Sequence, residues 1–249
     1  MGKYDNIKID THTHTLISGH AYHTLDEMIN EAKKKSMDVL CITEHGPAMP
    51  GSCHLYYFTN YMSLKDRKEF FEELSPIDIY LGAEANIMNM QGELDMDLED
   101  PIVKKCMDIV IASIHNCCFT SPSAYVANLA MLNVIKNPNI HIIGHPDDRD
   151  FNYEEIVLAA KEYGKILELN NSSNNPSGFR SGARERDLKM LELCKKHQVP
   201  ISLASDAHTK YDIGNFNFII PILEEVDFPL DLIINSSKEN FEKYIKKKL

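Results

Sequence analysis

The sequence has no excess of positive charge, no long hydrophobic run and no regular cysteine spacing. Its formal net charge at pH 7 is −11 over 249 residues, which argues against nucleic-acid binding through a general basic surface. The longest apolar runs, such as IVIASI and FIIPIL, are too short to span a bilayer. The first residues, MGKYDNIKID, lack the apolar core of a secretory signal. We therefore expect neither a membrane protein nor a secreted one.

The six cysteines follow neither the spacing of a zinc ribbon nor that of a secreted disulfide framework. Cys117 and Cys118 are adjacent, which is unfavourable for an ordinary disulfide between them. We therefore expect reduced thiols in a cytoplasmic protein, with Cys41 and Cys106 in the core.

Strand and helix patterns alternate along the whole chain. Seven short β-rich runs are apolar until polar residues end them: IKIDTH, DVLCITEH, IYLGAEAN, DIVIASIH, IHIIGHP, KILELNNS and PISLASDAH. Such runs are typical of parallel strands buried on both faces. Helical patterns lie between many of them, the first with a capping box of Thr24 and Glu27. No linker or low-complexity block interrupts the sequence, so we predict one α/β domain over residues 1–249.

Side chains that can bind metal follow the ends of six of these seven runs. In chain order they are His12, His14, His20, His45, Glu84, His115, His145, Asp206 and His208. Barrel enzymes build their sites from the C-terminal ends of several strands, whereas an open sheet concentrates its site at one switch point. We therefore predict a closed barrel with a metal site at the C-terminal ends of the strands.

Each of these residues alone is weak evidence for a metal site. A single His-x-His, or one histidine at a strand end, is more often an ordinary polar residue than a ligand. Nine such residues at equivalent positions together indicate a metal centre. We expect His23, His141 and His197 to be structural or solvated. The role of His54 is left open between the surface and contact with substrate.

The ordered series DTHTHT, SGHAY, TEHG, GAEANI, SIH, GHP, LNNSS and SDAH resembles the PHP (polymerase and histidinol phosphatase) family. It is most similar to the stand-alone, YcdX-like bacterial phosphatases of that family. The resemblance extends from about Ile9 to the C-terminal helical pattern, with the motifs in family order. It implies a distorted, seven-stranded, TIM-like (β/α)7 barrel with a trinuclear metal site, usually of zinc.

The resemblance also implies how the nine ligands divide among three ions. The first ion would be held by His12, His14, Glu84 and Asp206. The second would be held by His20, His45 and His208. The third would be held by His115 and His145, with Glu84 bridging the first and third ions.

Two positions depart from the family pattern. Glu44 stands where relatives commonly carry an aspartate, directly before His45. Asp147 and Asp148 occupy a turn that is usually less acidic. The ligand set remains complete, while the charge on the substrate side of the site differs from that of relatives.

Seven imidazoles and two carboxylates suit Zn²⁺, with Mn²⁺ or Fe²⁺ as alternatives. Three such ions would make the barrel mouth positive, so a phosphate monoester is the expected substrate. The expected reaction is attack on phosphorus by a metal-bound hydroxide, with Asp206 and His208 combining metal binding with proton transfer. Arg180 matches the position of a loop arginine in relatives and would bind the substrate phosphate. Arg184 and Arg186 are expected at an exposed helix start.

Several functions other than a general small-molecule phosphatase stay open. Histidinol phosphate is one substrate of the family, but the resemblance does not single it out. A nuclease-type phosphodiesterase is disfavoured by the acidic charge, and a metal-dependent amidohydrolase by the lack of a lysine at any strand end. A non-catalytic metal-binding regulator would bind the ions without turnover. A homo-oligomer is compatible with the sequence.

Overall fold

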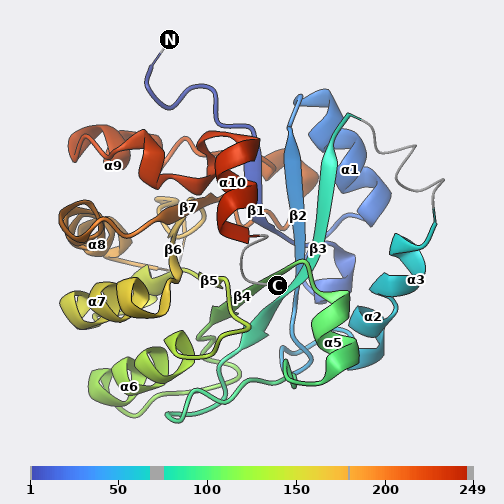
Figure 1. Ribbon diagram of the computed structural model, residues 1–249, viewed down its shortest axis with the longest axis horizontal. Helices are drawn as coiled ribbons and strands as arrows, with labels where there is room; N and C mark the ends of the chain where they lie inside the picture. The colour runs from blue at the N-terminus through green and yellow to red at the C-terminus, as the bar shows by residue number, and fades with distance from the viewer. Residues whose placement is uncertain (1, 68–75, 179, 246–249) are drawn as a thin grey trace.

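The computed structural model describes residues 2–67, 76–178 and 180–245. Within these ranges, seven parallel strands form one sheet whose spatial order follows the chain order (Figure 1). The strands are β1 (Ile9–Thr13), β2 (Val39–His45), β3 (Asp78–Asn86), β4 (Ile109–Ser113), β5 (Ile142–Ile143), β6 (Ile166–Asn170) and β7 (Ile201–Ala204). The sheet curls into a nearly closed barrel, which confirms the predicted fold class.

Most of the helices surround the curled sheet on its outer side, and the last helix, α10, lies across one end of it (Figure 1). They are α1 (Leu25–Lys34), α2 (Leu55–Thr59), α3 (Tyr61–Lys65), α5 (Pro101–Cys106), α6 (Ala124–Ile135), α7 (Tyr153–Tyr163), α8 (Ala183–His197), α9 (Ile220–Glu225) and α10 (Lys238–Ile245). The 3₁₀ turns are η1 (Leu16–Ser18), η2 (Pro146–Asp148), η3 (Lys210–Asp212), η4 (Leu230–Leu232) and η5 (Ile234–Ser236). Among the described residues, no helix combines the length and apolar character that crossing a membrane requires.

Helix α1 illustrates how the local sequence determines an element. Thr24 is its N-cap, and the reciprocal bonds between Thr24 and Glu27 form the predicted capping box. The buried side chains Met28, Ile29 and Ala32 recur at helical spacing. They pack in the large cluster between helices and sheet, which explains why this segment forms an amphipathic helix against the barrel.

Alternation along the strands gives the barrel interior an apolar floor and a polar mouth. On β2, Leu40 and Ile42 pack toward the helices, so Val39, Cys41 and His45 face inward. The floor cluster consists of Ile9, Val39, Cys41, Ile109, Ile111, Ile142, Ile166, Ile234, Phe241 and Ile245. Because its last two members belong to α10, this helix covers the N-terminal end of the barrel. The C-terminal end is left for polar side chains.

The first and last strands meet through the segments that follow them. The Asp206 amide donates to the His12 carbonyl at 3.0 Å, and the His14 amide donates to the Ala207 carbonyl at 2.9 Å. An isolated parallel bridge joins Thr13 to Ala207. These bonds draw two segments that carry predicted ligands together at the mouth.

The other end of this seam is joined by the side chain of Asn235 in η5. Its Nδ2 donates to the carbonyls of Ile9 and Leu203, both at 2.8 Å. Its Oδ1 accepts from the Leu203 amide at 2.7 Å. The buried side-chain amide of Asn235 therefore takes the place of backbone hydrogen bonds between β1 and β7.

Replacing Asn235 with alanine should destabilise the whole barrel. Asn235→Ala leaves buried backbone groups of Ile9 and Leu203 without this partner, which we expect to lower the free energy of unfolding by roughly 2–4 kcal/mol. Equilibrium urea unfolding measures the change. Asn217→Ala, at an exposed position, serves as the control, and equal losses in the two variants would contradict this role.

Candidate metal centre

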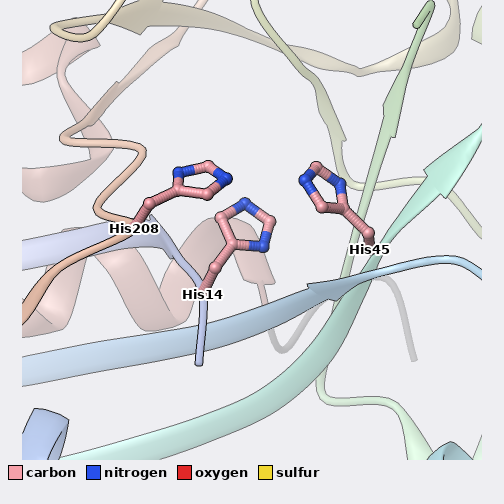
Figure 2. Close-up of side chains that lie close together, drawn as sticks. All are labelled: His14, His45 and His208. Carbon is pink, nitrogen blue, oxygen red and sulfur yellow. The ribbon is translucent and has the colours of Figure 1, made fainter. Parts of the chain in front are cut away.

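The barrel mouth brings the nine predicted ligands into one cluster. His12 lies on β1, His45 ends β2 and Glu84 lies on β3, while the others lie in the loops that follow β1, β4, β5 and β7. Three overlapping groups have donor atoms within 4.8 Å of one another: His14 with His45 and His208, His12 with His14 and Asp206, and His45 with Glu84 and His115. Figure 2 shows the rings of His14, His45 and His208 lying close together.

Glu84 is the most connected member of this cluster. Its Oε2 lies 2.7 Å from His45 Nδ1 and 3.3 Å from His12 Nε2. Its Oε1 lies 2.9 Å from His145 Nε2 and 3.3 Å from His115 Nε2. One carboxylate thus contacts rings from four other strand ends, as a bridging ligand would.

His20 reaches the cluster from the loop after β1. Its Nε2 lies 3.0 Å from Nε2 of His208 and 3.3 Å from Nε2 of His45. These three residues were expected to share one ion. The ring of His14 also lies close to His45, with centroids 4.2 Å apart, and His14 belongs to two of the three donor groups. The division of ligands among ions therefore stays a prediction.

Hydrogen bonds behind the rings determine which nitrogens face the centre. Asn86 Oδ1 accepts from His115 Nδ1 at 2.7 Å, because the Asn86 amide group donates to the Asp95 carboxylate. Nε2 of His115 therefore presents its lone pair toward Glu84. Donation of Nδ1–H to an outer acceptor is the usual arrangement of a metal-binding histidine.

The same arrangement occurs at His14. Its Nδ1 lies 2.9 Å from Ser18 Oγ, and Ser18 gives its own proton to Glu44 Oε2 at 2.6 Å. Ser18 therefore accepts from His14, and the Nε2 lone pair of His14 points inward. Nε2 of His12 lies 3.0 Å from it. Two ring nitrogens this close to each other fit two ligands of one cation, which would lie beside the line that joins them.

Glu168 holds the ring of His12 from behind. Its Oε1 accepts from His12 Nδ1 at 2.8 Å, and its Oε2 accepts from the His145 amide at 2.7 Å. Glu168 also accepts from Asn170 Nδ2 at 3.1 Å. The sequence analysis did not single out Glu168, Ser18 or Asn86. Strand parity offered a signal for Glu168, which shares a face of β6 with Asn170, and for Asn86, which shares a face of β3 with Glu84.

The buried carboxylate of Asp10 joins the first strand to the segments that follow the last strand. It accepts from the Ser205 amide at 3.1 Å and from the Gly214 amide at 2.8 Å. It also accepts from the backbone amide of His12 at 3.5 Å. Asp10 therefore ties β1 to the segments after β7.

Electrostatics in the cluster favour metal-binding protonation states. Burial lowers the pKa of His45 to about 4, and burial beside His45 and His208 places the pKa of His14 well below its usual range. Burial raises the pKa of Glu84, but the neighbouring histidines outweigh this effect and hold that pKa well below the usual range. Neutral imidazoles and ionised carboxylates are the forms that bind metal ions.

His12 shows the demand for positive charge most clearly. Although burial opposes protonation, Glu168, Glu84 and Asp206 raise the pKa of His12 well above its usual range. Carboxylates that stabilise a proton at this position also attract a bound cation. The donor set and its charge therefore fit divalent metal ions.

Two members of the cluster have left-handed backbone conformations that are rare for residues with a side chain. His145 has φ 27° and Asp206 has φ 55°. Such conformations persist where surrounding contacts hold them, and they are concentrated at functional sites. Here the His145 amide is bound by Glu168 and the Asp206 amide by the His12 carbonyl.

A cavity of about 260 Å³ opens beside the cluster. Arg180 lines it, with Nη1 donating to Ser173 Oγ at 2.8 Å and lying 3.6 Å from Asp206 Oδ2. Arg184 and Arg186 lie at the start of α8, where Arg184 pairs with Glu225 on the surface. His54 is exposed, caps α2 and does not line this cavity, so its contact with substrate stays a prediction.

Comparison with known proteins places the chain in a family. The PHP domain model matches residues 10–243. A protein of Caldicellulosiruptor bescii described as a probable phosphatase is 42% identical over 242 residues, covering 96% of both chains. A probable phosphatase of a Thermoanaerobacter species is 41% identical over 243 residues, covering 96% of this chain and 95% of that protein.

A solved structure supports the fold. Histidinol phosphate phosphatase from Lactococcus lactis, complexed with zinc, L-histidinol and phosphate, superimposes with a TM-score of 0.63 at 20% identity. The match covers 90% of this chain and 95% of that one. Together with the family model and the relatives above 40% identity, this agreement leads to one conclusion: the chain belongs to the PHP domain family.

Proposed function

We propose that the protein is a metal-dependent phosphatase that hydrolyses a small phosphomonoester at a trinuclear site. The observation that carries this proposal is the buried set of inward-facing imidazole nitrogens around Glu84, with Nδ1 hydrogens bound by outer acceptors. The description of relatives as probable phosphatases supports it. The acidic chain and its six free thiols agree with a cytoplasmic enzyme that does not bind nucleic acid.

The metal ligands in this proposal are His12, His14, His20, His45, Glu84, His115, His145, Asp206 and His208. Zn²⁺ suits this set of nitrogen and oxygen donors, and Mn²⁺ or Fe²⁺ are the alternatives. Bound ions of this kind lower the pKa of a coordinated water toward about 7 and neutralise charge on phosphoryl oxygens. The protein supplies the fixed positions of its donors and a cavity for the ester.

Asp206 connects the proposed ligands to the phosphate-binding side of the cavity. Its Oδ1 lies 3.4 Å from His14 Nε2, while its Oδ2 lies 3.6 Å from Arg180 Nη1. The Arg180 guanidinium can therefore hold a phosphoryl oxygen close to the carboxylate. Asp206 and His208 are the proposed residues for proton transfer, with His208 the more exposed of the two.

The cavity limits the substrate to a small ester. Its volume of about 260 Å³ lies below the usual range for sites of drug-sized ligands. Histidinol phosphate is one candidate, because the Lactococcus lactis structural neighbour holds L-histidinol and phosphate. Residues at the cavity rim, rather than the metal ligands, would select among small esters.

A panel of phosphate esters tests the proposed function. Zinc- or manganese-loaded protein should release phosphate from small phosphomonoesters, histidinol phosphate included, and not from phosphodiesters. Asp206→Asn should lower kcat by roughly 10²–10³-fold, because a charged group at the reacting centre is lost. Asp231→Asn, at an exposed position, is the control. Absence of turnover from every ester, with metal bound, would reject the phosphatase and favour a regulator.

Glu168 should affect metal binding although it is not a proposed ligand. Glu168→Gln keeps the side-chain shape but turns one acceptor into a donor, opposite either the His12 ring or the His145 amide. We expect metal affinity to fall about 10- to 100-fold, measured by competition with a chromophoric chelator. Exposed Glu162→Gln is the matched control. Unchanged affinity in Glu168→Gln would exclude this role.

Arg180 should determine substrate binding. Removing a charged donor to phosphate in Arg180→Ala should raise KM about 10- to 100-fold, with a smaller effect on kcat. Arg180→Lys should recover only part, because lysine lacks the bidentate geometry. Steady-state kinetics beside surface variant Arg184→Ala measures the difference. An identical KM in both alanine variants would show that Arg180 does not bind the ester.

A further inference from the structure

Two adjacent thiols lie at the mouth of the candidate metal centre. Cys117 and Cys118 occupy the turn after β4, two and three residues beyond His115. The amide of Cys118 donates to the His115 carbonyl at 2.9 Å, which closes the turn. The turn places the two Sγ atoms 3.8 Å apart. Cys117 is exposed and lines the same cavity as Arg180 and His115.

A third sulfur atom lies beside this pair. Met49, in the loop after β2, has its Sδ 3.4 Å from Cys117 Sγ. Met49 is buried and also lines the cavity. Two loops therefore converge to place the sulfur atoms of Cys117 and Met49 at the wall of a cavity that nitrogen and oxygen donors also line, with the sulfur of Cys118 next to that of Cys117.

The spacing of the thiols distinguishes between two kinds of chemistry. A disulfide requires its sulfurs to lie about 2.0 Å apart, which is far shorter than the separation in this turn. Two sulfurs bonded to one central atom, at bond lengths of about 2.3 Å as in zinc thiolates, lie much farther apart than in a disulfide.

We infer that Cys117 and Cys118 form a binding site for a thiophilic, trivalent metalloid that bridges both sulfurs and closes the cavity to the phosphate ester. Soft sulfur donors select soft elements, whereas the histidines and carboxylates deeper in the mouth suit zinc. The site itself is independent of the proposed phosphatase function. Only the expected inhibition rests on that function.

The binding reaction with an organic arsenic(III) oxide balances without an oxidant. Both S–H bonds and the bonds from arsenic to oxygen break, and two As–S bonds form. The oxygen leaves as water with the two thiol protons, and arsenic stays trivalent. Because the second bond forms within the same chain, the pair should bind far more tightly than either thiol alone.

Treatment of the metal-loaded protein with phenylarsine oxide tests the site. Intact-mass measurement should show one phenylarsenic adduct per chain, located by digestion to the peptide with Cys117 and Cys118. Phosphate release should be lost in parallel, and 2,3-dimercaptopropanol should reverse both effects. Cys117→Ser and Cys118→Ser, each compared with its own untreated activity, should require roughly 10²-fold more reagent.

Cys53→Ser is the matched control, because Cys53 is a partly buried thiol that does not line the cavity. This variant should form the adduct as the original chain does. An adduct that persists in both Cys117→Ser and Cys118→Ser would overturn the site. An adduct at the pair that leaves phosphate release unchanged would overturn the closing of the cavity. The mass measurement needs no turnover, so failure of the proposed phosphatase function would be recognised separately.

Discussion

The buried carboxylate of Glu84 is the group on which the arrangement of the barrel mouth depends. Its side chain is 1% exposed, and histidines from four other strand ends lie within 3.3 Å of its oxygens. A buried ionised carboxylate is unfavourable unless positive charge or strong hydrogen bonding compensates for its lost hydration. Histidine rings, and the cations that they would bind, provide that compensation. Glu84 and the histidine rings around it are therefore stable at the mouth only together.

The nearly closed barrel is what allows Glu84 and the surrounding histidines to come together. In a parallel sheet, the C-terminal ends of the strands all lie on one edge, and curling brings that edge into a ring. Bonds between the segments after β1 and β7 place His14 and Asp206 side by side, with 3.4 Å between Nε2 and Oδ1. The fold and the donor cluster thus depend on the same seam.

The clustering of the proposed ligands at the barrel mouth could be predicted from the sequence because their positions obey a simple rule. Each follows an apolar run, and His45 shares strand parity with the floor residues Val39 and Cys41, so a parallel barrel directs it inward. The capping box of Thr24 was visible for a similar reason, since its partner is three residues away. Patterns that are local, or that recur in every strand, are readable without coordinates.

The residues that sequence reasoning missed depend on contacts between distant segments. Ser18 binds His14 only because the loop after β1 folds onto Glu44 of β2. Asn235 joins Ile9 and Leu203 across the seam, more than 220 positions from one of its partners. No periodic pattern and no motif in the sequence indicates such hydrogen-bond partners. The sequence around His54 left its role open. In the structure, His54 caps the start of α2 and does not line the cavity.

The acidic chain and its proposed anionic substrate are compatible because charge is arranged locally. The net charge of −11 is spread over the molecule, and a salt-containing solvent screens it within about 10 Å. Inside the mouth, Arg180 is held near Asp206 and Asp148, so its positive charge stays at the cavity wall. A phosphate ester that enters meets this guanidinium and the proposed cations at short range, where screening is weak. The local field, rather than the net charge, then determines which ligand the cavity prefers.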